Sequence, residues 1–186
     1  MPHVNTTQPL ALIVMGVSGC GKSTLAQLLA QHYGFEFIEA DDYHSQTAKN
    51  LMAQGTPLTD AHREPWIQAL CQQLQRLAAE GKSTVLAYSG LRAHHRARFR
   101  TLGLPVQFIH LVGDKELIRS RMQARQNHFM PAGLVDSQFA ALDSTSEETD
   151  VIEISVAASV DAIIEEGKIM AQKFIQATSG QRPKAV

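Results

Sequence analysis

The chain has 186 residues, of which 44% are hydrophobic and 19% are charged. At about 150 residues per domain this length predicts one domain, and the balance of apolar and charged residues excludes a disordered chain. Seventeen basic and eighteen acidic residues give a net charge of −1. No overall field therefore attracts the chain to nucleic acid or to a membrane surface, and we expect neither as a partner.

The cysteines and the amino-terminal residues favour a cytoplasmic location. Cys20 and Cys71 are too few for a disulfide framework and are typical of a reducing compartment. The first residues, MPHVNTTQPL, lack the basic start and the long apolar stretch of a secretion signal. The apolar run at 10–15 is far shorter than the ~20 residues that cross a bilayer.

Short apolar runs alternate with helical patterns along the chain. Strands are predicted at residues 10–15, 35–40, 84–88, 106–112 and 151–156. Helices are predicted at 23–33, with Gly34 as the C-cap, at 115–125, with Asp114 as the N-cap, and at 159–175. A further helix is predicted to begin at Asp60, and its apolar face carries Ile67, Leu70, Leu74 and Leu77. Strands separated by helices predict an α/β fold, with a parallel sheet covered on both faces.

Two segments have no regular pattern. Residues 125–149 are polar and irregular, which is typical either of a lid or of a long surface loop. Residues 177–186 have no apolar period and are predicted to form a flexible tail. We therefore expect one domain over residues 1–176.

The most specific pattern is the octapeptide GVSGCGKS at residues 16–23. It follows the first predicted strand and opens the first predicted helix, as the phosphate-binding pattern G-x-x-x-x-G-K-[ST] requires. Lys22 is expected on the β- and γ-phosphates and the Ser23 hydroxyl on Mg²⁺, whereas Cys20 fits a reactive thiolate and a small filler residue equally well. We therefore predict that a nucleoside triphosphate with Mg²⁺ is bound by Gly16, Ser18, Gly19, Cys20, Gly21, Lys22, Ser23 and Thr24.

An acid pair follows the second predicted strand, at the edge where open α/β sheets bind their ligands. Asp41 or Asp42 would accept the proton of an attacking hydroxyl or hold Mg²⁺ through water, and an ordinary helix cap is the alternative. No acid ends the strand at 84–88, and no N-K-x-D-like guanine reader is present. A small-molecule kinase is therefore favoured over a GTPase or an ATPase motor.

The following segment resembles the gluconokinase family, the ATP:D-gluconate 6-phosphotransferases. Its motifs are ADDYH at 40–44, NLM at 50–52, GTPLTD at 55–60 and REPW at 63–66. Further matches are SGLR at 89–92 with Arg96, and a run that comprises Arg121, Arg125, His128-Phe129, Leu134 and Ser137-Gln138-Phe139. The resemblance extends from about residue 10 to residue 156.

The resemblance implies a three-layer P-loop fold like that of adenylate kinase. A five-stranded parallel sheet, an acceptor-binding region near residues 42–80 and a lid near residues 121–145 are expected. The implied reaction transfers the γ-phosphoryl group of ATP to the 6-hydroxyl of gluconate, commonly in a homodimer.

Site roles follow from the same resemblance. Lys22, Asp41 and Arg125 are the implied catalytic residues, with Ser23 and Asp41 at the metal. Arg121 and Arg125 share one helix face and would reach the phosphates of ATP, although a solvated basic helix end is the alternative. The acceptor is expected on Asp41, His44, Arg63, Ser89, Arg92, Arg96 and His128.

Several positions near the acceptor end depart from the family pattern. Tyr88, Gly90 and Arg92 stand where the family has Cys, Ala and Lys, and residues 95–97 replace a Y-R-D-like segment. A related sugar acid, a shikimate-like acceptor, a nucleoside monophosphate or a non-catalytic ATP-binding regulator therefore stay as alternatives. His94 and His95 are adjacent and should point different ways from a helix, so no metal site is predicted there.

Overall fold

The structure is a computed structural model of the chain, and it describes residues 6–124 and 132–179. Its strands form one parallel sheet in the order β2-β3-β1-β4-β5. Each strand begins and ends within one residue of its predicted position: β1 (Ala11–Met15), β2 (Glu36–Glu39), β3 (Thr84–Ala87), β4 (Val106–Val112) and β5 (Val151–Ser155). The α/β prediction is confirmed.

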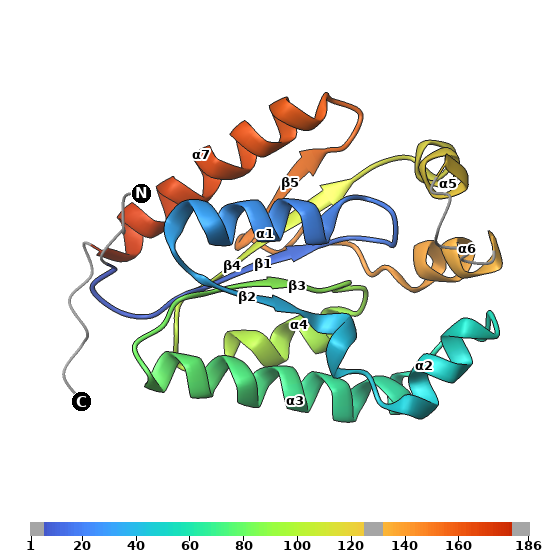
Figure 1. The fold of residues 1–186 in the computed structure, drawn as a ribbon, viewed down its shortest axis with the longest axis horizontal. Helices are drawn as coiled ribbons and strands as arrows, with labels where there is room; N and C mark the ends of the chain where they lie inside the picture. Colours follow the sequence, from blue (N-terminus) through green and yellow to red (C-terminus); the bar gives the residue numbers. More distant parts are fainter. Residues whose placement is uncertain (1–5, 125–131, 180–186) are drawn as a thin grey trace.

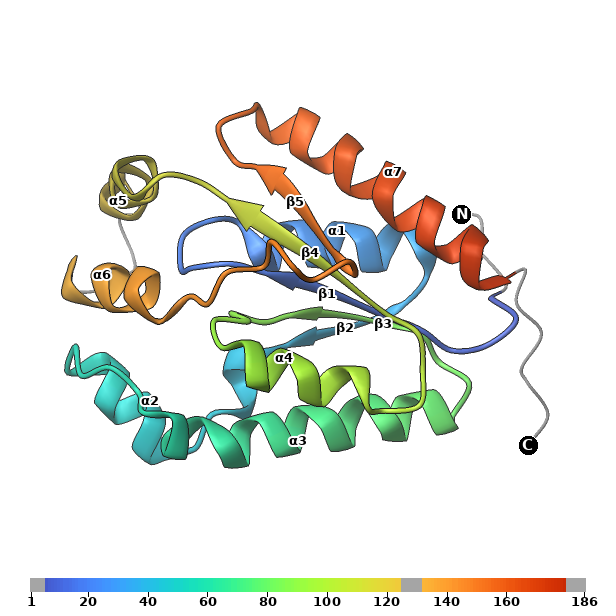
Figure 2. The same cartoon turned by 180° about the vertical axis from the view of Figure 1, so that it is seen from behind.

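Helices cover both faces of this sheet, as Figures 1 and 2 show. One face carries α1 (Lys22–Tyr33) and α7 (Val160–Ser179), and the other carries α3 (Asp60–Ala79) and α4 (Ala93–Arg100). Because successive strand residues point to opposite faces, β1 supplies both cores. Leu12 and Val14 join the core beneath α1, whereas Ile13 and Met15 join the core above α3.

The carboxyl ends of the strands carry the remaining short elements. They are the 3-10 helix η1 (Ala40–Tyr43), α2 (Gln46–Ala53), α5 (Lys115–Ala124) and α6 (Ala132–Ala141). Figure 1 shows α2, α5 and α6 at the same end of the molecule as the loop between β1 and α1. Ligands of open α/β sheets bind at this edge, so the fold brings the predicted site segments together.

Helix α6 corrects the prediction that residues 125–149 are irregular throughout. Leu134 and Val135 are buried, and Phe139 packs against the same core one turn later. Apolar residues are spread around this ten-residue helix rather than along one face, so no helical period stands out in the sequence. The helix is stabilised by burying Leu134 and Val135 rather than by its intrinsic pattern.

Two helix ends also differ from the prediction. Thr59, not Asp60, is the N-cap of α3, because its hydroxyl accepts the N–H of His62 at 3.3 Å. Helix α7 continues to Ser179 with Thr178 buried, so residues 177–179 belong to the folded domain rather than to a tail. The caps at Gly34 and Asp114 are as predicted. Among the described helices, none has the length and apolar character needed to cross a membrane.

Candidate active site

The loop between β1 and α1 has the backbone of a phosphate loop. Gly16, Gly19 and Gly21 have φ angles of 142°, 84° and 100°, a region that residues with a Cβ rarely adopt. A Cβ on Gly19 would lie 2.5 Å from the sulfur of Met122 in α5, so this glycine also permits close packing. Cys20 is buried in the core beneath the loop, which favours the filler interpretation.

The start of α1 fits a polyphosphate. Among the described residues, no side chain caps this helix, and a Cβ on Gly21 would meet nothing within 4 Å. The N–H groups of the first turn therefore have no capping side chain in the described part of the chain, and they lie at the positive end of the helix dipole. Lys22 donates to the Val17 carbonyl at 3.1 Å, so its ammonium lies over the same loop. Ser23 and Thr24 are exposed beside it.

A glutamine of α6 binds this loop directly. The Gln138 side-chain oxygen accepts the Ser18 N–H at 2.7 Å, and its nitrogen donates to the Ser18 hydroxyl at 2.9 Å. Sequence reasoning noted Gln138 only within the family resemblance. Two bonds from one amide place α6, the second half of the predicted lid, against the phosphate loop.

Asp41 lies in η1, at the end of β2, with 80% of its side chain exposed. His44 Nε2 is 3.7 Å from its carboxylate, and the buried His44 ring stacks on Trp66 with centroids 4.0 Å apart. Burial lowers the pKa of His44 despite the nearby Asp41 charge, so the ring is neutral at pH 7. Trp66 also donates to the Ala40 carbonyl at 2.7 Å, which fixes η1 to α3. Asp42 is exposed on the same turn.

Glu39 is a site residue that the sequence interpretation missed. It is the last residue of β2, and its partial burial raises the pKa of its carboxyl while the nearby Ser23 and Lys22 lower it. The Glu39 carboxylate therefore lies near the Ser23 hydroxyl, and Asp41 follows two residues later in η1. Oxygen donors of this kind suit Mg²⁺, so the residues present fit the metal that P-loop kinases use.

Two predicted acceptor cations meet on one carboxylate. Asp60 Oδ1 is 2.9 Å from Arg63 Nη1, and Asp60 Oδ2 is 3.6 Å from Arg92 Nε. Arg92 also donates to Asp143 at 2.9 Å. The Ser89 carbonyl accepts the N–H of Gly16 at 3.1 Å, which joins the loop after β3 to the phosphate loop.

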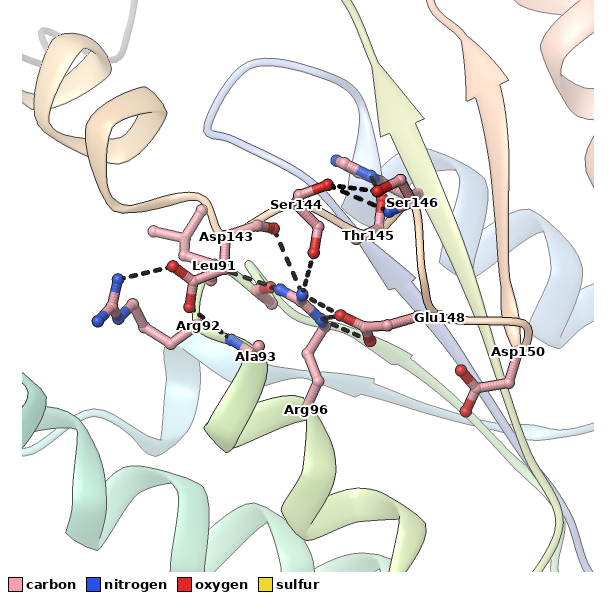
Figure 3. Close-up of polar contacts among 12 residues, drawn as sticks. Leu91, Arg92, Ala93, Arg96, Asp143, Ser144, Thr145, Ser146, Glu148 and Asp150 are labelled. Carbon is pink, nitrogen blue, oxygen red and sulfur yellow. Dashed lines mark hydrogen bonds and ion pairs between the residues drawn. The ribbon is translucent and has the colours of Figure 1, made fainter.

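Arg96 corrects a prediction, because it is a structural residue rather than a ligand-binding cation. Its side chain is fully buried, and Figure 3 shows its guanidinium pointing into the segment that follows α6. It forms a bidentate pair with Glu148 and donates to the carbonyls of Gly90, Leu91, Asp143 and Ser144. With these acceptors the guanidinium has no donor left for a phosphate or a sugar acid.

The predicted lid cations are placed only in part. Arg121 donates to the Val156 carbonyl at 2.5 Å, so in this structure it lies at the end of β5 rather than over the phosphate loop. Arg125 and His128 lie outside the described residues.

Comparisons with known proteins match nearly the whole chain. A family model described as an AAA domain matches residues 12–149. A gluconokinase from Gluconobacter oxydans (strain 621H) is 39% identical over 160 residues, which are 86% of this chain and 89% of the relative. A gluconokinase from Arabidopsis thaliana is 35% identical over 177 residues, or 88% of this chain and 93% of the relative.

A solved structure agrees with these relatives. The crystal structure of a gluconokinase from Sinorhizobium meliloti 1021 superposes with a TM-score of 0.83 at 30% identity, and the match covers 91% of this chain and 95% of that chain. The fold is therefore shared with the solved gluconokinase, and the sequence is similar to these relatives over most of their length.

Proposed function

The chain belongs to the gluconokinase family, and we propose that it transfers the γ-phosphoryl group of ATP to the 6-hydroxyl of D-gluconate, giving 6-phosphogluconate. The observation that carries the proposal is one juxtaposition. An uncapped helix N-terminus behind a glycine ring, an exposed carboxylate at the end of β2, and a pair of arginines on Asp60 all lie at one edge of the sheet. A triphosphate, a hydroxyl and a carboxylate are the groups that this set recognises.

The phosphate loop holds ATP in this proposal. N–H groups of the loop and of the first turn of α1 bind the phosphates, and Lys22 leaves the Val17 carbonyl to reach the transferring group. Ser23 and Glu39 would hold Mg²⁺ directly and Asp41 would hold it through a water molecule, and the ion would neutralise charge on the phosphates of ATP. Arg125 adds positive charge from the lid, and Arg121 joins it after leaving the Val156 carbonyl, roles that follow from the family resemblance.

Gluconate is placed between η1 and the start of α4. Its carboxylate accepts from Arg63 and Arg92, which Asp60 already holds together, so little side-chain entropy is lost on binding. Ser89, His44 and His128 are proposed to bind its hydroxyls. Asp41 takes the proton of the attacking 6-hydroxyl. The next residue, Asp42, is exposed to solvent and has no role in the proposed reaction.

The family resemblance also carries two proposals about the whole protein. We propose that it is a homodimer and that it works in the cytoplasm. Light scattering of the purified chain measures the mass directly, and a value near the 20.4 kDa of one chain would contradict the dimer.

The proposed reaction is tested by coupling ADP release to a spectrophotometric readout, with Mg²⁺ and a panel of acceptors. We expect kcat/KM for D-gluconate to exceed that for related sugar acids, shikimate and nucleoside monophosphates by at least tenfold, or about 1.4 kcal/mol of transition-state discrimination. Arg63→Ala should raise KM for gluconate far more than KM for ATP.

Other outcomes of the panel decide between the alternatives. A preference for a different acceptor would mean that the departures from the family pattern at Tyr88, Gly90 and Arg92 change the specificity of the acceptor pocket. Binding of ATP with no turnover on any acceptor would favour a non-catalytic regulator.

A further inference from the structure

We propose that Asp60, His94 and His95 form a binding site for a divalent transition-metal ion of the Zn²⁺ class, on residues other than those proposed for Mg²⁺. The site lies where the first turn of α3 meets the first turn of α4. One potential ligand atom from each residue lies within 4.8 Å of the other two.

The structure overturns the prediction that the two histidines diverge. His94 and His95 have ring centroids 4.1 Å apart, and the neighbouring helix α3 brings Asp60 to both. The sequence does not reveal this cluster, because the third ligand lies more than thirty residues before the two histidines.

His95 has one ring nitrogen near a carboxylate and the other without a partner in the described part of the chain. Its side chain is 1% exposed, and its Nε2 is 3.2 Å from a carboxylate oxygen of Glu64. Its Nδ1 is buried and has no hydrogen-bond partner among the described residues. We assign Nδ1 as the ligand atom, since metal-bound histidines usually give their other nitrogen to a carboxylate or a carbonyl. An ion would therefore supply the partner that this buried nitrogen lacks.

Asp60 keeps one oxygen for the ion. Its Oδ1 is held by Arg63 at 2.9 Å, while its Oδ2 lies 3.9 Å from His94 Nε2. Bonds of about 2.0–2.1 Å bring tetrahedral ligands to roughly 3.3 Å from one another, so the cluster must contract slightly. The His94 side chain is 52% exposed and free to make that movement.

Two positive charges oppose an ion at Asp60: Arg92, whose Nε is 3.6 Å from Oδ2, and Arg63, whose Nη1 is 2.9 Å from Oδ1. Arg92 is the one on the oxygen that the ion would use. Its guanidinium has a second carboxylate, Asp143 at 2.9 Å, and can keep that pair when the ion binds. Two imidazoles and one carboxylate suit Zn²⁺, Co²⁺, Ni²⁺ or Cu²⁺ rather than Mg²⁺, which prefers oxygen ligands. A water molecule completes the coordination.

The site also touches the proposed acceptor pocket. Asp60 holds both Arg63 and Arg92, so an ion on Asp60 would compete for the carboxylate that positions these arginines. This consequence rests on the proposed function, whereas the metal site itself does not.

The test measures metal binding on the full chain without ATP or gluconate, so its result does not depend on kinase activity. Zn²⁺ is titrated against a chromophoric chelator, and Co²⁺ is used as a spectroscopic probe, because its absorption distinguishes nitrogen and oxygen ligands from thiolates. We expect one site per chain. His94→Ala should weaken Zn²⁺ binding at least tenfold, and Glu64→Gln should weaken it less.

The control is His32→Ala, which removes an exposed histidine on α1 and should leave the affinity unchanged. His95→Phe removes the buried ligand, and circular dichroism tests whether this variant folds. His94 is half exposed, so its variant keeps the test valid if His95→Phe does not fold. Equal Zn²⁺ affinity in the wild type and His94→Ala, no binding at all, or a thiolate spectrum with Co²⁺ would each overturn the proposal.

Discussion

Replacing Asp41 by Asn is expected to lower kcat by about 10²–10⁴-fold, the usual contribution of a general base, while ATP binding stays close to that of the wild type. The carboxylate stands exposed at the end of β2, where an incoming hydroxyl can reach it, and an amide of the same shape cannot take its proton. The P-loop contacts of the nucleotide come from other residues, so they survive the change. Steady-state kinetics together with calorimetric titration of ATP separate the two effects.

Asp42→Asn is the matched control, because it changes the neighbouring carboxylate on the same exposed turn. We expect it to keep kcat within about threefold, as surface changes away from the reacting atoms do. If the losses were reversed between the two variants, Asp42 would be the base. If Asp41→Asn instead weakened ATP binding and left kcat unchanged, Asp41 would act on the nucleotide rather than on the acceptor.

The sheet was predictable because each strand is a short segment rich in apolar residues, separated from the next by glycines and polar caps. The run at 10–15 is buried on both faces, so nothing in its pattern competes with a strand. Helix α6 was missed for the opposite reason. Its stability comes from the burial of Leu134 and Val135 against distant elements, which a local period does not record.

The position of the phosphate loop was predictable, because its glycine pattern is local in sequence. The roles of arginines were not, because an arginine's role depends on which acceptors lie within reach of its guanidinium. Arg63 and Arg92 converge on Asp60, whereas Arg96, only four residues after Arg92, is turned inward to Glu148. Glu39 and the Asp60–His94–His95 cluster were missed for the same reason, because each depends on contacts between separate elements.

Replacing Arg96 by Leu is expected to lower the free energy of unfolding by about 3–5 kcal/mol, as breaking a buried ion pair does. Among the described residues, the change leaves Arg100 as the one basic partner of Glu148. It also removes a hydrogen-bond donor from the carbonyls of Gly90, Asp143 and Ser144. A typical domain has about 5–15 kcal/mol in total, so much of the stability would be lost. Urea denaturation followed by circular dichroism measures the difference.

The pH dependence of the free energy of unfolding is a second measure of the Arg96–Glu148 ion pair. Hydrogen bonds from Arg96 and Arg100 hold the pKa of Glu148 below its usual value, against the opposing effect of burial. The pair therefore stabilises the fold at neutral pH, and this contribution disappears as the pH falls through the lowered pKa. The difference between the wild type and Arg96→Leu should shrink in acid.

The matched control for Arg96 is Arg98→Ala, on the same helix. Arg98 is exposed and pairs with the exposed Glu64 at 2.8 Å, so its loss should cost at most about 1 kcal/mol. Arg96→Lys keeps the charge but not the planar fork, and it should fall between the two. Because Arg96 ties residues 143–148 to the loop at Gly90 and Leu91, a folded variant should raise KM for gluconate more than KM for ATP. If the Arg96 variant were as stable as the wild type but had lost turnover, Arg96 would be a ligand-binding residue rather than a structural one.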